Sequence, residues 1–190
     1  MDRRIKYTKG VIKDTFLNLL EEKDISNITV TEVCKIADIN RATFYRYYDD
    51  CYDLLKKIQD EFMEELTNSS PMINLPDESV YDFTYGVLKV FENNKKLITL
   101  LFNTNNNIYF LNEVLEYCYN KCVLKWSSLF PDYNKNMIEY QTVFIFNGAL
   151  GVINYWIKND FLEDASFIAK MIEDTTIDGV NKYITTKKSS

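Results

Sequence analysis

The chain has 190 residues, of which 46% are hydrophobic and 15% aromatic, and this composition excludes an intrinsically disordered protein. It has no histidine, which removes the usual general base, the usual partner of a Ser or Cys nucleophile and the commonest metal ligand, so an enzyme, a metal site and a cofactor are not expected. The net charge is -6, but residues 1–60 hold 11 basic and 11 acidic side chains, so any attraction for phosphate has to come from a local face.

The four cysteines fall at helical positions and not in a regular disulfide framework, which is typical of reduced thiols in a cytoplasm. Cys118 and Cys122 are i,i+4 neighbours that could share a metal. No second pair of ligands is apparent, so two small buried residues on one helix face explain the spacing better.

No segment of the sequence predicts export or a membrane span. The N-terminal residues are basic, but no apolar segment follows them as in a signal peptide. The most hydrophobic stretch, residues 143–157, is interrupted by Asn147 and Asn154 and is shorter than the roughly 20 residues that a span needs. We therefore expect a cytoplasmic protein with no membrane partner.

Apolar residues recur at spacings of three and four along most of the chain, which predicts an all-α fold. The first helix is expected over residues 8–23, with Thr8 as its N-cap. The basic residues before it are either an arm that reaches the DNA backbone or minor groove, or a disordered tail; they are Arg3, Arg4, Lys6 and Lys9.

A helix-turn-helix pattern follows. Thr29 to Glu32 has the spacing of a capping box and opens a second helix. The inward face of that helix is predicted to hold Val30, Val33, Cys34, Ile36 and Ala37. Residues 38–40 form a turn whose Asp and Asn tolerate left-handed or capping geometry, and Asn40 can cap a third, short helix over residues 41–47.

A fourth helix over residues 51–66 is expected after the acidic pair Asp49 and Asp50, which suits its positive end. The Ser- and Pro-containing stretch 68–79 is the one credible linker, so we predict a DNA-binding domain over 1–68 and an effector-binding and dimerisation domain over 69–190. The later helices are expected at 79–93, 95–103, 108–129, 137–159 and 164–184, with turns at 131–134 and 159–160.

The third helix has the composition of a DNA-reading surface. Arginine can bind guanine edges, the methyl groups of Ala and Thr can meet thymine, and tyrosine hydroxyls can donate to phosphate. The residues available are Arg41, Ala42, Thr43, Tyr45, Arg46 and Tyr47, of which Arg41 and Arg46 are the choice for base readout. The alternative is a solvated basic face over core aromatics. Thr29 and Thr31 begin the second helix, where free amides form either a phosphate site or a cap without a ligand.

Residues 28–48, ITVTEVCKIADINRATFYRYY, followed by Asp53-Leu-Leu, resemble the DNA-binding domain of TetR-family regulators. The resemblance covers residues 8–58, and Thr-Phe-Tyr in the third helix is its most specific part. It implies phosphate contacts for Thr29 and Thr31, base contacts for Arg41, Ala42 and Arg46, and backbone or base contacts for Thr43, Tyr45 and Tyr47.

Three residues depart from the family pattern. Tyr47 stands where the family often has histidine, and Asp38 where it usually has glycine in the turn. Cys51 stands where a phosphate-binding lysine usually begins the fourth helix. The loss of that lysine beside an acidic pair suggests weaker affinity for the DNA backbone.

The second domain resembles the family in outline only, as a helical body whose last two long helices form the dimer. Residues 143–157 are apolar on nearly all sides, which favours a dimer interface over a purely internal core. The interface residues expected are Gly148, Gly151, Ile168, Met171 and Ile172. An effector pocket is expected among Tyr85, Phe91, Phe102, Tyr117, Trp126, Phe144, Asn147, Tyr155 and Trp156, with ordinary core packing as the alternative for each.

These features predict a transcription regulator that binds a palindromic operator in double-stranded DNA as a homodimer and responds to a small-molecule effector, as a ligand-responsive repressor. A ligand that splays the reading heads would release DNA, and one that sets them at the right spacing would activate binding. The first alternative is an adaptor that keeps the fold and acts through protein partners with weak or no operator binding. The second, ranked far lower, is an enzyme with a carboxylate pair or with Cys51 as nucleophile.

Overall fold

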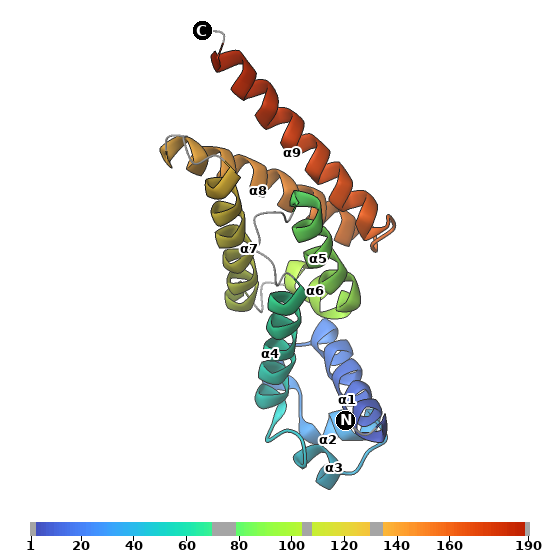
Figure 1. The fold of residues 1–190 in the computed structure, drawn as a ribbon. Helices are drawn as coiled ribbons and strands as arrows, with labels where there is room; N and C mark the ends of the chain where they lie inside the picture. The colour runs from blue at the N-terminus through green and yellow to red at the C-terminus, as the bar shows by residue number, and fades with distance from the viewer. Residues whose placement is uncertain (1–2, 70–78, 104–107, 130–134, 189–190) are drawn as a thin grey trace. The chain divides into compact units, whose positions relative to one another are not determined.

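The computed structural model describes residues 3–69, 79–103, 108–129 and 135–188, and in this part every regular element of the chain is a helix (Figure 1). The predicted all-α class is confirmed. No helix in the described ranges is long and apolar enough to cross a membrane. The elements in chain order are α1 (Arg3–Glu22), the 3-10 helix η1 (Ile25–Asn27), α2 (Val30–Ile36), α3 (Arg41–Tyr45), α4 (Cys51–Ser69), α5 (Val80–Asn93), α6 (Lys95–Asn103), α7 (Ile108–Leu129), α8 (Lys135–Lys158) and α9 (Ala165–Lys188).

The chain forms two compact units. The first comprises residues 1–64 and 96–108, and the second comprises residues 65–95 and 109–190. The first change of unit therefore lies inside α4, slightly before the boundary expected between 68 and 69, and most of α6 belongs to the first unit. Most of the predicted linker (70–78) and all of the predicted turn at 131–134 lie outside the described residues.

The first unit is built around aromatic and aliphatic side chains spaced along amphipathic helices. α1 packs on α2, and α2 packs on α3. Phe16 of α1, Phe44 of α3 and Leu54 of α4 are fully buried. Burial of large apolar side chains of this kind is the main force that holds these helices together. The unit therefore presents α3 from a fixed core.

The start of α1 corrects two predictions. The helix begins at Arg3, and Thr8 lies inside it as its Oγ1 donates to the carbonyl of Arg4 at 2.9 Å. Thr8 is thus no N-cap. The basic residues Arg3, Arg4, Lys6 and Lys9 lie on the first helical turns, so they are not a disordered tail, and their contact with DNA stays a prediction.

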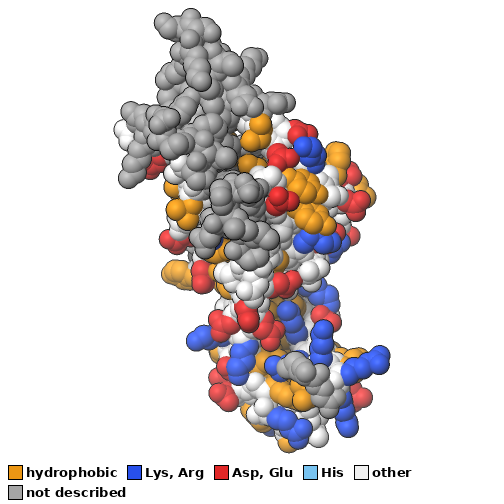
Figure 2. Space-filling view, viewed as in Figure 1, with side chains coloured by type: hydrophobic (Ala, Val, Ile, Leu, Met, Phe, Trp, Pro, Cys, Tyr) orange, Lys and Arg blue, Asp and Glu red, His pale blue; other side chains and the backbone are white. Residues whose placement is uncertain are grey.

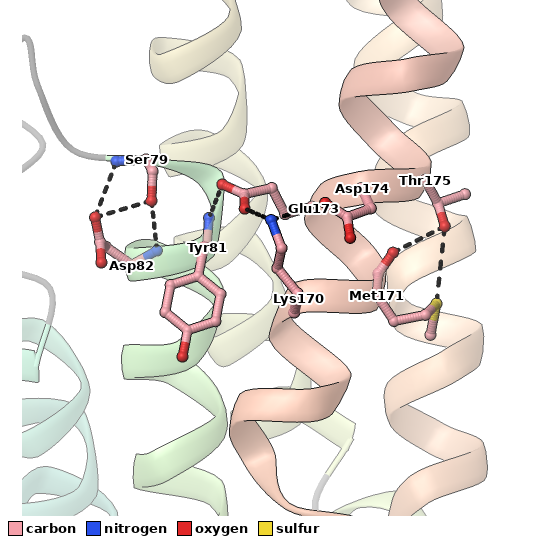
Figure 3. A network of polar contacts seen from close by, with 8 residues as sticks. All are labelled: Ser79, Tyr81, Asp82, Lys170, Met171, Glu173, Asp174 and Thr175. Atoms are coloured by element: carbon pink, nitrogen blue, oxygen red, sulfur yellow. Dashed lines mark hydrogen bonds and ion pairs between the residues drawn. The ribbon is translucent and has the colours of Figure 1, made fainter.

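In the second unit, α9 packs along α5 and also against α8. Ser79 and Asp82 form a capping box at the start of α5, and the next free amide, that of Tyr81, donates to Glu173 of α9 (Figure 3). Lys170 in turn donates to the same carboxylate at 3.0 Å. The beginning of α5 is therefore fixed by the cap in its own first turn and by Glu173 of α9.

The turn between α8 and α9 has a defined geometry. Asp160 and Phe161 have left-handed backbones with φ of 54° and 55°, and the Phe161 amide donates to the carbonyl of Trp156 at 3.0 Å. This is the bond of a Schellman motif, and its usual apolar contact is the edge-to-face pair of Trp156 and Phe161 at 4.7 Å. The turn expected at 159–160 is therefore present.

One glycine allows a close approach. A Cβ at Gly86 of α5 would lie 2.8 Å from the carbonyl oxygen of Ser69, the last residue of α4. That separation is too short for a carbon and an oxygen atom, so any larger residue would push α5 away from the end of α4.

Candidate nucleic-acid interface

The turn between α2 and α3 ends the first of the two helices sharply. Asp38 has a left-handed backbone with φ of 51°, and the amide of Ile39 donates to the carbonyl of Cys34 at 3.0 Å. This again is the pattern of a Schellman motif, in which the left-handed residue is usually glycine. Asp tolerates that conformation better than most residues, which explains how the chain keeps the turn without the glycine typical of the family.

The next residues start α3. The Oδ1 atom of Asn40 accepts hydrogen bonds from the amide of Thr43 at 2.7 Å and from the hydroxyl of Thr43 at 2.9 Å. The predicted N-cap is therefore present. The hydroxyl hydrogen of Thr43 is used within the cap, so this side chain has its oxygen lone pairs and its methyl group left for a ligand.

Two aromatic side chains hold α3 against the unit. Phe44 is 0% exposed and Tyr48 is 4% exposed, and their ring centroids lie 5.6 Å apart. The ring of Tyr45 meets Phe44 edge to face at 5.8 Å. Burial raises the pKa of Tyr48 to about 12, which keeps its hydroxyl neutral. The Phe at the centre of the Thr-Phe-Tyr motif is thus a structural anchor for the residues around it.

The outer side of α3 carries the predicted base-reading residues. Arg41, Ala42, Tyr45 and Arg46 are all exposed. The Nη2 atom of Arg41 donates to the hydroxyl of Tyr45 at 3.1 Å, and the guanidinium lies 5.7 Å from the centre of that ring. Among the residues that the structure describes, the Arg46 guanidinium has neither a hydrogen bond nor an ion pair. Arg41 is thus oriented by Tyr45, whereas the Arg46 guanidinium is available to bind a ligand.

The C-terminal end of α3 is shorter than predicted. The helix ends at Tyr45, Arg46 is its C-cap, and Tyr47 lies in the following turn. The half-buried ring of Tyr47 faces Lys9 of α1, whose ammonium is 5.9 Å from the ring centre. Figure 2 shows further Lys and Arg side chains over this unit, with acidic side chains between them.

At the start of α2, the structure bears out half of the predicted capping box. The Thr29 hydroxyl accepts from the Glu32 amide at 3.3 Å, but the Glu32 carboxylate pairs with Lys23 at 2.6 Å instead of reaching back. A bond to an ammonium is stronger than one to a neutral amide, which explains the choice. Thr29 and Thr31 are both exposed. Ile36, predicted to face inward, is 57% exposed and is a further correction.

The acidic residues before α4 have a structural role. The Oδ1 atom of Asp50 accepts from the amide of Asp53 at 2.8 Å, and the Oδ2 atom of Asp53 accepts from the amide of Asp49 at 3.0 Å. Lys57 bonds the Asp53 carboxylate and the Tyr47 carbonyl, and this ammonium lowers the pKa of Asp53. The carboxylates of Asp50 and Asp53 therefore accept hydrogen bonds at the start of α4, and Lys57 partly neutralises the charge of Asp53.

Cys51 stands where the family pattern usually has a phosphate-binding lysine, and in this chain the side chain at that position belongs to the core. Its side chain is 4% exposed, and burial raises the pKa of its thiol to about 11. A nucleophilic cysteine needs an accessible thiolate, so the geometry does not support the enzyme alternative at this residue.

Comparisons with known proteins identify the chain. The TetR_C_8 model, described as a transcriptional regulator C-terminal region, matches residues 78–178, which is more than half of the chain. The chain belongs to the TetR family of transcriptional regulators. The N-terminal resemblance and this C-terminal match rest on different residues, so they support the family assignment separately.

Relatives and solved structures agree with a TetR-family regulator. The chain is 30% identical over 79 residues to the uncharacterized HTH-type transcriptional regulator YxbF of Bacillus subtilis (strain 168), a match to 41% of this chain and 21% of that protein. A TetR transcriptional regulator from Streptococcus agalactiae 2603V is 23% identical with a TM-score of 0.58, covering 92% of this chain and 96% of the other. The fatty acid degradation regulator FadR from Bacillus halodurans is 17% identical with a TM-score of 0.60, covering 89% and 94%.

The second unit of this TetR-family regulator contains a cavity of about 60 Å³. Its walls from α5 and α7 are Phe83, Thr84, Val87, Phe91, Leu115, Cys118 and Cys122.

Of the residues predicted to line an effector pocket, Phe91 lines this cavity. Tyr85 instead stacks on Tyr81 at 5.6 Å, and Tyr117 lies under Lys121 at 5.5 Å. Trp156 is buried and donates to the Glu163 carbonyl, Phe102 belongs to the first unit, and the side chain of Trp126 lies outside the described residues.

α8 has two different apolar faces. One face lines the cavity with Phe146, Ala149, Leu150 and Ile153. The other is exposed and comprises Tyr140, Phe144, Asn147, Gly148, Gly151 and Tyr155, named here the outer face of α8. Phe144 is 82% exposed and Tyr155 is 72% exposed, and the Asn147 amide nitrogen donates to the Val143 carbonyl. Phe144, Asn147 and Tyr155, which were predicted as pocket residues, do not line this cavity.

The predicted interface residues divide between the surface and the core. Gly148 and Gly151 are exposed, and a Cβ at either would meet no atom within 4 Å among the described residues. Ile168 and Ile172 of α9 are buried inside the unit, and Met171 is half-buried. The two isoleucines therefore belong to the core of the single chain, and their place in a dimer interface stays a prediction.

Proposed function

We propose that this TetR-family regulator binds a near-palindromic DNA operator as a homodimer and reads it with α3. The observation that carries the proposal is the division of α3 and the residues just after it between core and surface. Phe44 and Tyr48 are buried in the core, whereas Arg41, Tyr45 and Arg46 are exposed. A short, capped helix with exposed arginines over a fixed aromatic anchor suits direct contact with base edges in a major groove.

The individual roles follow from the side-chain chemistry. Arg41 and Arg46 are assigned to base edges, with Ala42 against a thymine methyl. Thr29 and Thr31, exposed at the N-terminus of α2, are assigned to phosphate oxygens. Thr43, Tyr45 and Tyr47 are assigned to the backbone or to bases, with Tyr45 also holding Arg41 in place.

The outer face of α8 is the proposed dimer interface. Exposed large apolar side chains in one patch are typical of surfaces that bind another protein. Gly148 and Gly151 lie in the same patch and leave room for a second helix to approach closely. A two-fold dimer presents its two reading helices to successive major grooves when they are about 34 to 36 Å apart, which is why the operator is expected to be a near-palindrome.

We propose that the regulator also responds to a small-molecule effector. The cavity within the second unit supports this proposal, since ligand pockets are concave and mostly apolar. An effector that favours a dimer with the wrong spacing releases DNA, and one that favours the right spacing promotes binding.

Selection of bound sequences from a random DNA pool, at low and physiological salt, tests the proposal. The purified full chain is expected to recover a palindromic motif, and Arg41→Ala with Arg46→Ala is expected to lose it. Lys158→Ala, an exposed substitution in the second unit, serves as a matched control and should keep it. No enrichment at either salt concentration would contradict operator reading and favour the adaptor alternative.

A further inference from the structure

The ammonium group of Lys57 in α4 is bound to the segment that joins α3 to α4. Its Nζ atom donates to the backbone carbonyl of Tyr47 at 3.0 Å and to the Oδ2 atom of Asp53 at 2.7 Å. It also lies 5.5 Å from the centre of the Tyr48 ring. Lysine has three N–H donors, so two of the donors of Lys57 are already used within the protein. This lysine therefore differs from a cation whose donors are all free to bind DNA phosphate.

The two acceptors of Lys57 fix this segment at both of its ends. The Tyr47 amide donates to the carbonyl of Phe44 in α3 at 2.9 Å, while the Tyr47 carbonyl accepts from Lys57. At the other end, the Oδ2 atom of Asp53 accepts from the Asp49 amide at 3.0 Å and from Lys57. The backbone between Tyr47 and Asp49 is therefore tied to α4 through one ammonium group.

Arg46 stands next to this tied backbone. It is the C-cap of α3, and Tyr47 follows it directly. An arginine can bind the O6 and N7 atoms of guanine together only if its backbone is held at the right distance and angle. Because no described residue binds the Arg46 guanidinium, the placement of this group depends on the backbone that Lys57 holds.

The exposure of the ion pair indicates that it acts mainly on geometry and only weakly on stability. The side chains of Lys57 and Asp53 are 45% and 24% exposed. Ion pairs that water can reach contribute little to the free energy of unfolding, because water competes for both charges. Removal of the pair should therefore leave the first unit folded and loosen the segment between the two helices.

We infer that Lys57 and Asp53 are positioning residues for operator reading, which hold the backbone after α3 so that Arg46 reaches a base edge. This inference rests on the proposed function and adds two residues that act on the DNA only through others. The competing role for Lys57 is a direct phosphate contact, in place of the lysine that is missing at position 51. A positioning residue sets the selectivity for the operator, whereas a phosphate contact sets the affinity for all DNA.

Fluorescence anisotropy of the full chain with the selected operator and with random DNA separates the two roles. Lys57→Met should lower the ratio of operator affinity to random-DNA affinity by about 5-fold or more, the lower end of what one base-reading arginine contributes. The salt dependence of random-DNA binding should stay unchanged. A phosphate contact predicts instead an equal loss for both DNAs and a salt slope that is smaller by about 1, and that result would overturn the inference.

Lys56→Met is the matched control, because it removes the same charge from the neighbouring position of α4. Lys56 is exposed and has no hydrogen bond or ion pair among the described residues. The variant should keep the affinity ratio of the wild type. A fall in the ratio equal to that of Lys57→Met would show that only the charge matters and would overturn the inference.

Asp53→Asn distinguishes the two roles from the acidic side of the pair. A positioning role predicts a lower affinity ratio, because Lys57 and the Asp49 amide lose their charged acceptor. A phosphate-binding Lys57 predicts tighter binding to both DNAs with the ratio unchanged, since the substitution removes a negative charge and releases the ammonium group. Asp60→Asn, at an exposed position of the same helix, controls for charge alone and should keep the ratio. An unchanged ratio in Asp53→Asn would overturn the inference.

A double-mutant cycle tests whether Lys57 acts through Arg46. In a protein that carries Arg46→Ala, Lys57→Met should lower the affinity ratio by less than about 2-fold, whereas independent effects would multiply. Lys57→Arg keeps the charge and the donors, so it should restore most of the ratio. Multiplied losses in the cycle would overturn the route through Arg46.

Two measurements separate failure of the inference from other failures. Circular dichroism identifies a Lys57→Met protein that is not folded, in which case the milder Asp53→Asn variant decides. The wild-type chain reports on the proposed function by itself. A wild type without preference for any operator would contradict operator reading and the inference with it, whereas a wild type that discriminates beside unaffected variants would overturn the positioning role alone.

Discussion

The carboxylate of Glu173 in α9 accepts a hydrogen bond at 3.0 Å from the backbone amide of Tyr81, which is 92 residues earlier in the chain. The first amides of a helix have no partner within it and carry partial positive charge. Glu173 satisfies one of these amides at the start of α5, a helix that lines the cavity. The contact therefore joins the cavity wall to α9.

Glu173→Ala is expected to lower the free energy of unfolding by about 1 to 2 kcal/mol, because a hydrogen bond to a charged group is lost at a partly buried site. Urea unfolding measures the change. Asp174→Ala is the matched control, since Asp174 is exposed and pairs only with Lys170 among the described residues, and it should cost less than about 0.5 kcal/mol. An equal loss of unfolding free energy in both variants would show that the hydrogen bond from the Tyr81 amide to Glu173 adds no stability.

Tyr45→Phe should weaken operator discrimination less than Arg41→Ala does. The variant keeps the ring under the guanidinium but removes the hydroxyl that accepts from Arg41 at 3.1 Å. Arg41 then keeps its charge and loses part of its orientation. Fluorescence anisotropy with the selected operator and with random DNA measures both affinities. A Tyr45→Phe variant as defective as Arg41→Ala would mean that the tyrosine hydroxyl itself contacts DNA.

Arg46→Ala should reduce discrimination between operator and random DNA by about 1 to 3 kcal/mol, the typical contribution of one base-reading arginine. The fold should be unaffected, because this side chain has no hydrogen bond or ion pair among the described residues. The same anisotropy titrations provide the measurement. An equal loss of affinity for both DNAs would assign Arg46 to phosphate only.

Phe144→Glu should convert the dimer into monomers without unfolding the protomer. Phe144 is 82% exposed in the single chain, so the substitution disturbs only what covers the outer face of α8. Gly151→Phe should act in the same direction by blocking close approach of a second helix. Sedimentation velocity measures the oligomeric state. A Phe144→Glu protein that still dimerises would remove this face from the proposed interface.

Stability should fall as the pH rises above about 9. Burial raises the pKa of Cys51 from 9.0 to about 11 and that of Tyr48 from 10.0 to about 12. The folded state holds these protons more tightly than the unfolded state does, so the associated stability is complete below pH 9 and is lost as the pH approaches 11 to 12.

Urea midpoints between pH 8 and 11 measure this loss, and the double variant Cys51→Ala and Tyr48→Phe should show a flatter decline. An unchanged decline in that variant would contradict the assignment of the two groups.

The local geometry of the reading head could be predicted from the sequence because neighbours in the chain determine it. Asn40 caps α3 and Asp38 takes the left-handed conformation as their residue types indicate. The partner of Glu32 could not be predicted, since Lys23 reaches it only through the packing of α1 against α2. The sequence predicted that α1 begins at Thr8 because threonine is a common N-cap. In the structure Thr8 lies inside the helix and its hydroxyl donates to the Arg4 carbonyl.

The faces of α8 could not be predicted for a different reason. The helix is apolar around most of its circumference, so its periodicity does not distinguish a cavity wall from an exposed face. Phe144 was expected in the pocket, yet Phe146, two residues later, lines the cavity. The burial of Ile168 and Ile172 depends on how α9 packs along α5, a contact between segments far apart in sequence.

The cap formed by Asp50 links the affinity of the protein for DNA to the stability of α4. Its negative charge repels DNA phosphate, but the same carboxylate accepts the Asp53 amide at 2.8 Å and starts α4, whose first turns carry buried Cys51 and Leu54. A substitution that removed the charge to tighten DNA binding would therefore loosen the helix beneath the reading head. Mutations that raise operator affinity without lowering stability are to be sought at exposed positions of α3 and at the surrounding lysines.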